Sequence, residues 1–117
     1  MASTIHSIVF DCADPVRLAH FWMAALRYVV EPGSEVDAEG AALIDPAAHG
    51  PRLLFNPVPE GKVVKNRLHL DLAPHDTMER ETGRLIALGA ALLRVFHEAH
   101  GTWTVPLGRA DVEYTAS

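Results

Sequence analysis

The sequence has one cysteine and a shortage of basic residues. Cys12 has no partner for an internal disulfide, which is typical of a protein kept in a reducing cytoplasm. The chain carries 10 Lys and Arg against 15 Asp and Glu, and its formal net charge is −5. Its densest basic stretch, residues 62–67, holds only three positive charges. Because nucleic-acid binding depends on a concentrated basic face, this balance excludes a nucleic-acid partner.

Long hydrophobic runs are also missing. Near-apolar stretches such as residues 87–95 are interrupted by glycine or arginine, whereas a membrane-spanning helix needs about 20 apolar residues. Residues 1–6 lack the basic and then apolar pattern of a secretory signal. We therefore expect a cytoplasmic protein with no membrane partner.

What is present is the composition of an ordinary globular domain. The 117 residues are 49% hydrophobic and 21% charged. A chain of this size and balance can bury a core without disulfides, so we expect one domain over residues 1–117.

The first half of the chain predicts a strand, a helix and three short strands. Alternation over residues 5–12 indicates the first strand, with Ile8, Phe10 and Cys12 toward the helix and Ser7 on the other face. Asp14 and the following proline supply an N-cap and a first helical residue. The helix should run to about residue 27. The short strands are expected over residues 28–30, 41–44 and 52–58.

The second half repeats this plan. Residues 66–73 read as a strand in which leucines alternate with polar residues. Asp76 should cap the next helix, because Glu79 follows it at the spacing of a capping box. Three further strands are expected over residues 90–97, 103–107 and 112–115.

The spacing of the two halves also agrees. Ser7 stands seven residues before Asp14, and His69 stands seven before Asp76. Such a repeat predicts an internally duplicated α+β fold, with module one over about residues 1–60 and module two over about residues 61–117.

Several stretches resemble the vicinal oxygen chelate superfamily, in its glyoxalase-like and bleomycin-resistance branch that is common among bacterial proteins. They are residues 9–15 running into 18–22, residues 54–60, residues 62–72 and residues 84–90. The string Lys-Asn-Arg-Leu-His-Leu-Asp-Leu at residues 65–72 is the most specific. The resemblance implies two βαβββ modules forming a curled mixed sheet, or cup, with the helices on its outer face. It also implies a homodimer.

Enzymes of this superfamily hold one divalent metal in the cup, through a residue on the first and last strand of each module. Carried over by position, these places fall at Ser7, Asn56, His69 and either Val112 or Glu113. Serine and asparagine are poor ligands for zinc, nickel or iron. We therefore expect no full metal site and no cofactor. His69 and Glu113 are the weak candidate ligands if a divalent metal does bind.

His69 and Asp71 form the best candidate catalytic pair. On a strand both would face the cup, where a histidine beside a carboxylate can act as a general base. The alternative is a structural polar pair with Arg67 as a partner. His6 is expected on the helix side of the first strand and satisfied locally. The candidate ligand-binding residues are Ser7, Asn56, Arg67 and Trp103, the last by stacking on a planar ligand.

Three functions of different classes are consistent with these residues. The first is a protein that binds or sequesters a small molecule in the cup, as metal-free bleomycin-resistance proteins do. The second is a metal-dependent lyase, isomerase or dioxygenase that uses His69 and Glu113. The third is a metal-free enzyme in which His69 and Asp71 transfer protons on a small carbonyl compound. The residues favour them in this order, and the sequence does not decide whether the protein is an enzyme.

Overall fold

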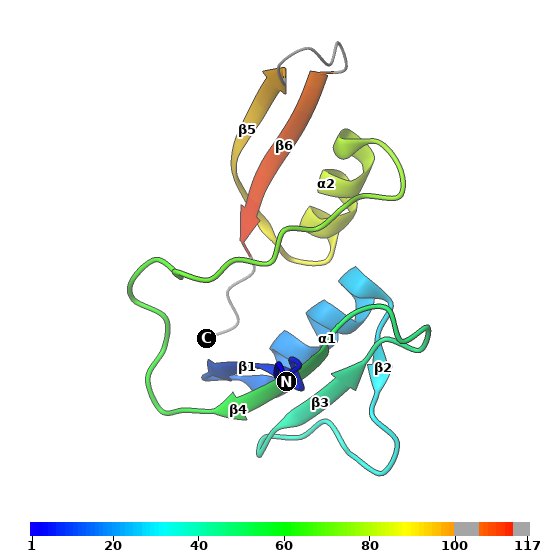
Figure 1. Cartoon of the computed structure of the whole chain (residues 1–117). Coiled ribbons are helices and arrows are strands. Elements are labelled where there is room, and N and C mark those ends of the chain that lie inside the picture. Colours follow the sequence, from blue (N-terminus) through cyan, green and yellow to red (C-terminus); the bar gives the residue numbers. More distant parts are fainter. Residues whose placement is uncertain (100–105, 114–117) are drawn as a thin grey trace. The chain divides into compact units, whose positions relative to one another are not determined.

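The computed structural model describes residues 1–99 and 106–113, with side chains described for residues 1–91. The chain divides into two compact units, one formed by Met1–Lys65 and the other beginning at Asn66. Figure 1 shows the elements of each unit in the order of the chain. Trp103 and the ends of the last two expected strands lie outside the described residues.

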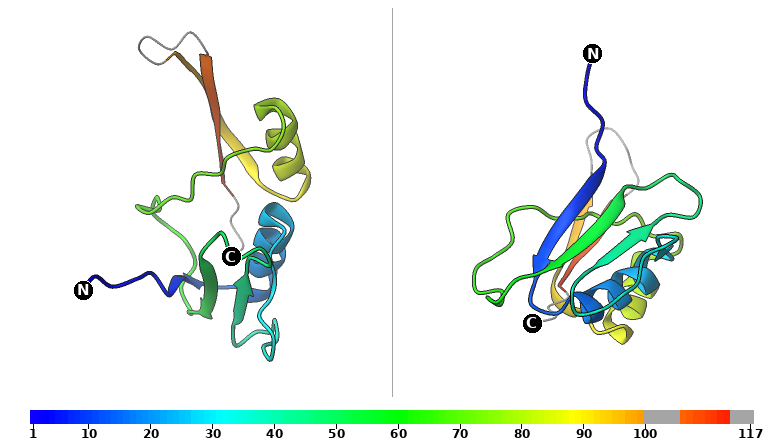
Figure 2. Two further views of the ribbon diagram at one scale, coloured as in Figure 1. Left: turned by 45° about the vertical axis from the view of Figure 1, so that its right-hand side comes forward. Right: turned by 90° about the horizontal axis from the view of Figure 1, so that it is seen from below.

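The first unit is a mixed sheet with one helix. Its elements follow the expected order and are β1 (Ser7–Cys12), α1 (Pro15–Leu26), β2 (Val29–Val30), β3 (Ala41–Ile44) and β4 (Arg52–Pro57). In the sheet the strand order is β1-β4-β3-β2, with β1 parallel to β4 and the other pairs antiparallel (Figure 2). These elements confirm the prediction for the first half to within about two residues at each end.

The ends of α1 are fixed by local chemistry. The side chain of Asp14 accepts a hydrogen bond from the Arg17 amide at 3.1 Å, and Pro15 occupies the first turn, where its missing N–H costs nothing. Arg27 ends the helix in the left-handed conformation, with φ of 58°. The Tyr28 amide then donates to the Met23 carbonyl at 3.1 Å. The predicted cap and length of this helix are confirmed.

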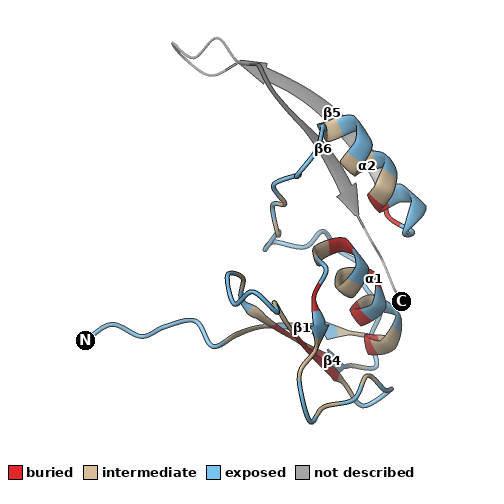
Figure 3. Ribbon diagram, turned by 90° about the vertical axis from the view of Figure 1, so that its right-hand side faces the viewer, coloured by how far each residue is buried: buried red, intermediate tan, exposed pale blue. Residues whose placement is uncertain are grey.

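The core of the first unit lies between α1 and one face of the sheet (Figure 3). Leu43, Leu53 and Phe55 are its largest fully buried side chains. Ala19 of α1 has no exposed surface, and its small side chain allows the helix to approach the strands closely. Phe10 of β1 stacks on Phe55 with ring centroids 5.0 Å apart. The face of β1 that was expected to pack on the helix therefore does so.

The opposite face of this sheet has no helix over it within residues 1–65, and we term it the open face. Strand register determines its members, because directly paired residues point to the same side. Ser7 pairs with Arg52, Val9 with Leu54 and Asp11 with Asn56, and Ala42 of β3 also pairs with Leu54. The open face thus includes Ser7, Val9, Asp11, Arg52, Leu54 and Asn56, and by alternation along β3 and pairing with β2 also Val29, Ile44 and Ala42, of which Ala42 is buried.

The second unit contains a helix and a hairpin. They are α2 (Met78–Ala87), β5 (Ala91–Ala99) and β6 (Pro106–Glu113). The expectation of three strands after this helix is wrong within the described residues. Residues expected in two separate strands form the single β6, which pairs antiparallel with β5 from Pro106 to Glu113. One long ladder satisfies more backbone groups than two short strands would.

The strand predicted over residues 66–73 is also wrong, because the structure has no strand between β4 and α2. A strand requires a neighbouring backbone to pair with, and in this unit β5 and β6 pair with each other. The side chain of Leu68 is 72% exposed. The expectation that His69 and Asp71 share one face of a strand therefore loses its basis.

The start of α2 differs from the prediction by one residue. Thr77 is the N-cap, and its hydroxyl accepts from the Arg80 amide at 3.2 Å. Asp76 accepts instead from the Thr77 amide at 2.7 Å and from the Arg80 guanidinium at 3.3 Å. Threonine and aspartate both cap helices, and here the second of two adjacent capping residues is used. Neither described helix is long enough to cross a membrane.

Candidate functional site

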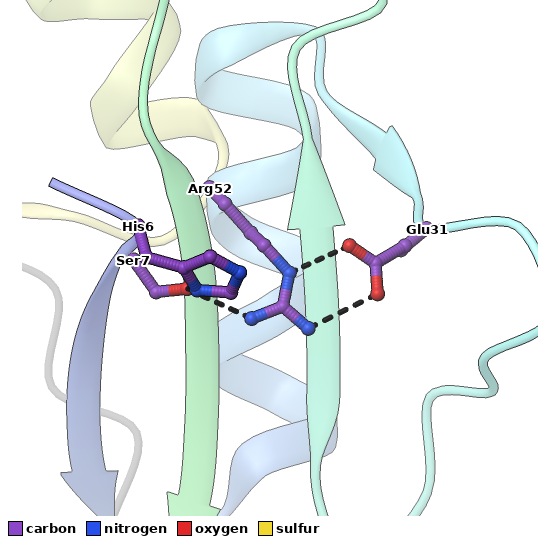
Figure 4. Close-up of polar contacts among 4 residues, drawn as sticks. All are labelled: His6, Ser7, Glu31 and Arg52. Atoms are coloured by element: carbon purple, nitrogen blue, oxygen red, sulfur yellow. Dashed lines mark hydrogen bonds and ion pairs between the residues drawn. The ribbon is translucent and has the colours of Figure 1, made fainter. Parts of the chain in front are cut away.

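Arg52 lies at the centre of a polar network at one end of the open face (Figure 4). Its Nε donates to Oε2 of Glu31 at 2.6 Å, and Nη2 donates to Oε1 of the same carboxylate at 3.0 Å. Its Nη1 donates to Oγ of Ser7 at 2.8 Å. Nδ1 of His6 lies 2.8 Å from the same hydroxyl oxygen. The guanidinium therefore forms a bidentate ion pair with Glu31 on one side and a hydrogen bond to the Ser7 hydroxyl on the other.

The sheet topology brings these side chains together from distant parts of the chain. Ser7 and Arg52 begin the parallel strands β1 and β4 and are direct neighbours in the register. Glu31 follows β2 at the far edge of the sheet, where its amide donates to the Ala42 carbonyl at 2.9 Å. The arginine side chain extends across the sheet to reach it (Figure 4).

The pair is held in its charged form. The hydrogen bond from Arg52 is the largest effect on the pKa of the Glu31 carboxyl and lowers it; desolvation opposes this shift, and the charge of Arg52 lowers the pKa further. The same hydrogen bond raises the pKa of Arg52 above its ordinary value. The side chains of Arg52 and Glu31 are 23% and 31% exposed. The network is therefore a partly buried ion pair whose hydrogen bonds hold the guanidinium in place.

Ser7 and Asn56 share the open face without meeting. Asn56 is paired with Asp11, four residues along β4 from Arg52. At about 3.3 Å per residue, about 13 Å separates the two ends of this stretch. The two side chains can contact opposite ends of one ligand. They are too far apart to hold one metal ion between them.

His69, Asp71 and Arg67 all lie in the segment without strand structure and are exposed. Nε2 of His69 lies 2.7 Å from the backbone carbonyl of Asn66, three residues earlier. Within the described part of the chain, no hydrogen bond joins His69 to Asp71. Their roles as a catalytic pair and in ligand binding stay predictions, as does the role of Glu113, of which only the backbone is described.

His6 differs from its expected position. It precedes β1, so the alternation of the strand does not direct its side chain, and its ring contacts the Ser7 hydroxyl instead of the helix side.

Sequence reasoning missed Arg52 and Glu31. A charged residue directly before the alternating Leu53 and Phe55 does mark the face away from the core. Its ion-pair partner is 21 residues away, and nothing local identifies it.

The residues of the first unit do not fit a divalent metal. Among the described residues, no group of three His, Cys, Asp or Glu side chains is placed to hold one. Ser7, where the resemblance puts a ligand, has its oxygen engaged by the guanidinium cation at 2.8 Å. A metal bound to this oxygen would lie directly against the positive charge of Arg52.

Comparison with known proteins identifies the family. The family model described as a glyoxalase-like domain matches residues 7–111. The chain belongs to this family. As a glyoxalase-like domain it is a member of the vicinal oxygen chelate superfamily, and the resemblance noted in the sequence is confirmed. Among curated proteins, none matches the chain.

Solved structures are similar to this glyoxalase-like domain at low sequence identity. One is a glyoxalase/bleomycin resistance protein/dioxygenase family enzyme from Burkholderia phytofirmans PsJN, with a TM-score of 0.62 and 16% identity over 84% of this chain and 83% of that chain. Another is TioX from Micromonospora sp. ML1, with a TM-score of 0.48 and 12% identity over 92% of this chain and 89% of that chain. The first of these supports the α+β fold, with its mixed sheet and two helices.

Proposed function

We propose that this glyoxalase-like domain binds a small organic molecule on the open face of its first sheet, without the metal of the superfamily's enzymes. The observation that carries the proposal is the contact between Arg52 and Ser7. The guanidinium of Arg52 donates a hydrogen bond to the Ser7 hydroxyl oxygen at 2.8 Å, at the place where the resemblance puts a metal ligand. In this proposal the guanidinium of Arg52 supplies the positive charge that a metal ion would otherwise supply at this place.

The surroundings of Arg52 suit an organic ligand. Val9 is 51% exposed on the open face, and the half-buried Leu54 is its direct neighbour in the register. Apolar surface with a few fixed polar groups is the usual lining of a small-molecule site. Asn56 adds an amide at the far end.

The same proposal includes a second module in the latter half of the chain, which together with the first would form the cup. The ends of the two helices support it. The Tyr28 amide donates to the Met23 carbonyl at 3.1 Å, and the Ala90 amide donates to the Leu85 carbonyl at 3.0 Å, with both residues shifted by the same 62 positions. The homodimer and the cytoplasmic location stay predictions.

Two measurements on the full-length chain test this function. Elemental analysis of protein purified from cells grown with zinc, nickel and iron in the medium should find far less than one metal ion per chain. An NMR screen of small organic compounds should find ligands that shift the amide signals of Val9 and Leu54 and leave those of the outer side of α1 unchanged. One tightly bound divalent metal per chain contradicts the proposal. So does a set of ligands whose shifts all fall away from the open face.

A further inference from the structure

We infer that the ligand is a monocarboxylic acid with an apolar body, whose carboxylate binds the unused end of the Arg52 guanidinium. This inference rests on the proposed function, because it names the chemical class of the molecule that the open face would take.

The guanidinium has hydrogen-bond donors to spare. An arginine side chain has five N–H groups, and among the described residues Glu31 and Ser7 take three of them, on Nε, Nη2 and Nη1. One N–H therefore remains on each terminal nitrogen. In Figure 4 the carboxylate and the serine approach from opposite flanks, so the end of the fork between the terminal nitrogens is left for another partner. Two adjacent N–H donors match the two oxygens of a carboxylate.

The donor group is also held in place before any ligand arrives. Three hydrogen bonds to two partners fix the arginine side chain, which is 23% exposed. Binding would cost little side-chain entropy, because the rotamer is already ordered. The negative charge of Glu31 offsets the positive charge of Arg52, so selectivity would come from the paired N–H geometry more than from net charge.

The direction of the fork determines where the rest of the ligand would lie. Figure 4 shows the two terminal nitrogens directed the way β1 and β4 run. In that direction the open face continues with Val9, Leu54 and Ala42 and ends at Asp11 and Asn56. The exposed Val9 and the half-buried Leu54 would contact an apolar body. The Asp11 carboxylate at the far end would disfavour a second acidic group, whereas Asn56 can bond a neutral polar one.

The test compares acids with amides of the same shape. Binding of phenylacetate and hexanoate to the full chain would be measured by NMR titration against phenylacetamide and hexanamide. We expect each acid to bind at least tenfold more tightly than its amide, with shifts at Val9 and Leu54. Arg52→Lys keeps the positive charge but loses the fork, and it should lower the affinity for the acids about tenfold while changing that for the amides little.

Arg17→Lys is the matched control, since this exposed arginine lies on α1, away from the open face, and it should change neither affinity. Equal affinities of acids and amides at the open face would overturn the inference and leave the proposed function standing. Failure of both acids to shift the open-face signals would also overturn it, while the wider screen and the metal analysis decide the proposed function separately. The comparison in the unaltered protein holds even if Arg52→Lys does not fold.

Discussion

Each unit of the chain contains a stretch of alternating apolar and polar residues, but only the stretch in the first unit forms a strand. β4 lies between β1 and β3; β1 pairs with it from Arg52 to Pro57, and β3 pairs with it from Leu53 to Phe55. Residues 66–73 alternate at least as regularly and have no strand partner. In the first unit, Leu53 and Phe55 are buried, whereas Leu68 in the second is 72% exposed. Alternation therefore selects which side chains can be buried, and the presence of a neighbouring strand decides whether they are.

The largest expected difference between the units comes from removing one apolar side chain from each. Phe55→Ala should lower the free energy of unfolding by about 3–5 kcal/mol, because Phe55 has no exposed surface and the change leaves a cavity. Leu68→Ala should change it by less than about 0.5 kcal/mol. Urea unfolding followed by circular dichroism measures both. A loss of several kcal/mol in Leu68→Ala would mean that residues 66–73 are packed in solution, and the contrast between the units would fail.

A glycine in each unit gives effects of opposite sign. A Cβ on Gly50 would overlap the hydroxyl of the buried Tyr28, so Gly50→Ala should destabilise the protein by about 1–3 kcal/mol. A Cβ on Gly83 in α2 would have nothing within 4 Å, so Gly83→Ala should stabilise it by about 1 kcal/mol. Thermal unfolding of both variants measures the difference. Adding Tyr28→Phe to the first variant should recover part of its loss, and no recovery would mean that the overlap is not the cause.

The residues that follow the two helices both have positive φ, but one is a glycine and the other an arginine, so exchanging these residue types tests the cost of that conformation. Gly89 after α2 has φ of 117°, and Gly89→Ala should cost about 1–2 kcal/mol. Arg27 after α1 has φ of 58°, so Arg27→Gly should gain about 0.5–1 kcal/mol. Urea midpoints of the two variants should move in opposite directions. If both variants lose stability, the arginine side chain contributes more to the end of α1 than its backbone conformation costs.

The smallest expected effect is a change in pH dependence in the first unit. Because Arg52 lowers the pKa of Glu31 below its ordinary value of 4.5, the unfolded chain takes up the proton first as the pH falls. The stability from this pair is therefore complete above about pH 4.5 and is lost as the pH falls through the lowered pKa. Glu31→Gln should be less stable than the unaltered protein at neutral pH, and the two should converge in acid. Glu60→Gln, at an exposed position, should leave the acid part of the curve unchanged.

Much of the first unit was predictable because its signals are local. Asp14 and Pro15 gave the start of α1, and the strand expected over residues 41–44 has the same bounds as β3. The position of Ser7 on the face away from the helix was also predicted from alternation and is confirmed by the register.

The errors have non-local or competing causes. Pairing partners for residues 66–73 and the ion-pair partner of Arg52 depend on how distant segments meet, which alternation does not encode. At α2 two adjacent residues, Asp76 and Thr77, can both cap a helix, and propensity alone does not choose between them. Sequence reasoning therefore predicted the face on which Ser7 lies and missed the charged residues around it.

The polar network of Arg52 also has a consequence for the order of folding. Its hydrogen bonds join residues separated by 21 and 45 positions in the chain, so they can form only after β1, β2 and β4 have come together. Interactions that form after the rate-limiting step slow unfolding and leave the folding rate nearly unchanged. We therefore expect the loss of these hydrogen bonds in Arg52→Ala to speed the unfolding of the sheet more than it slows its folding.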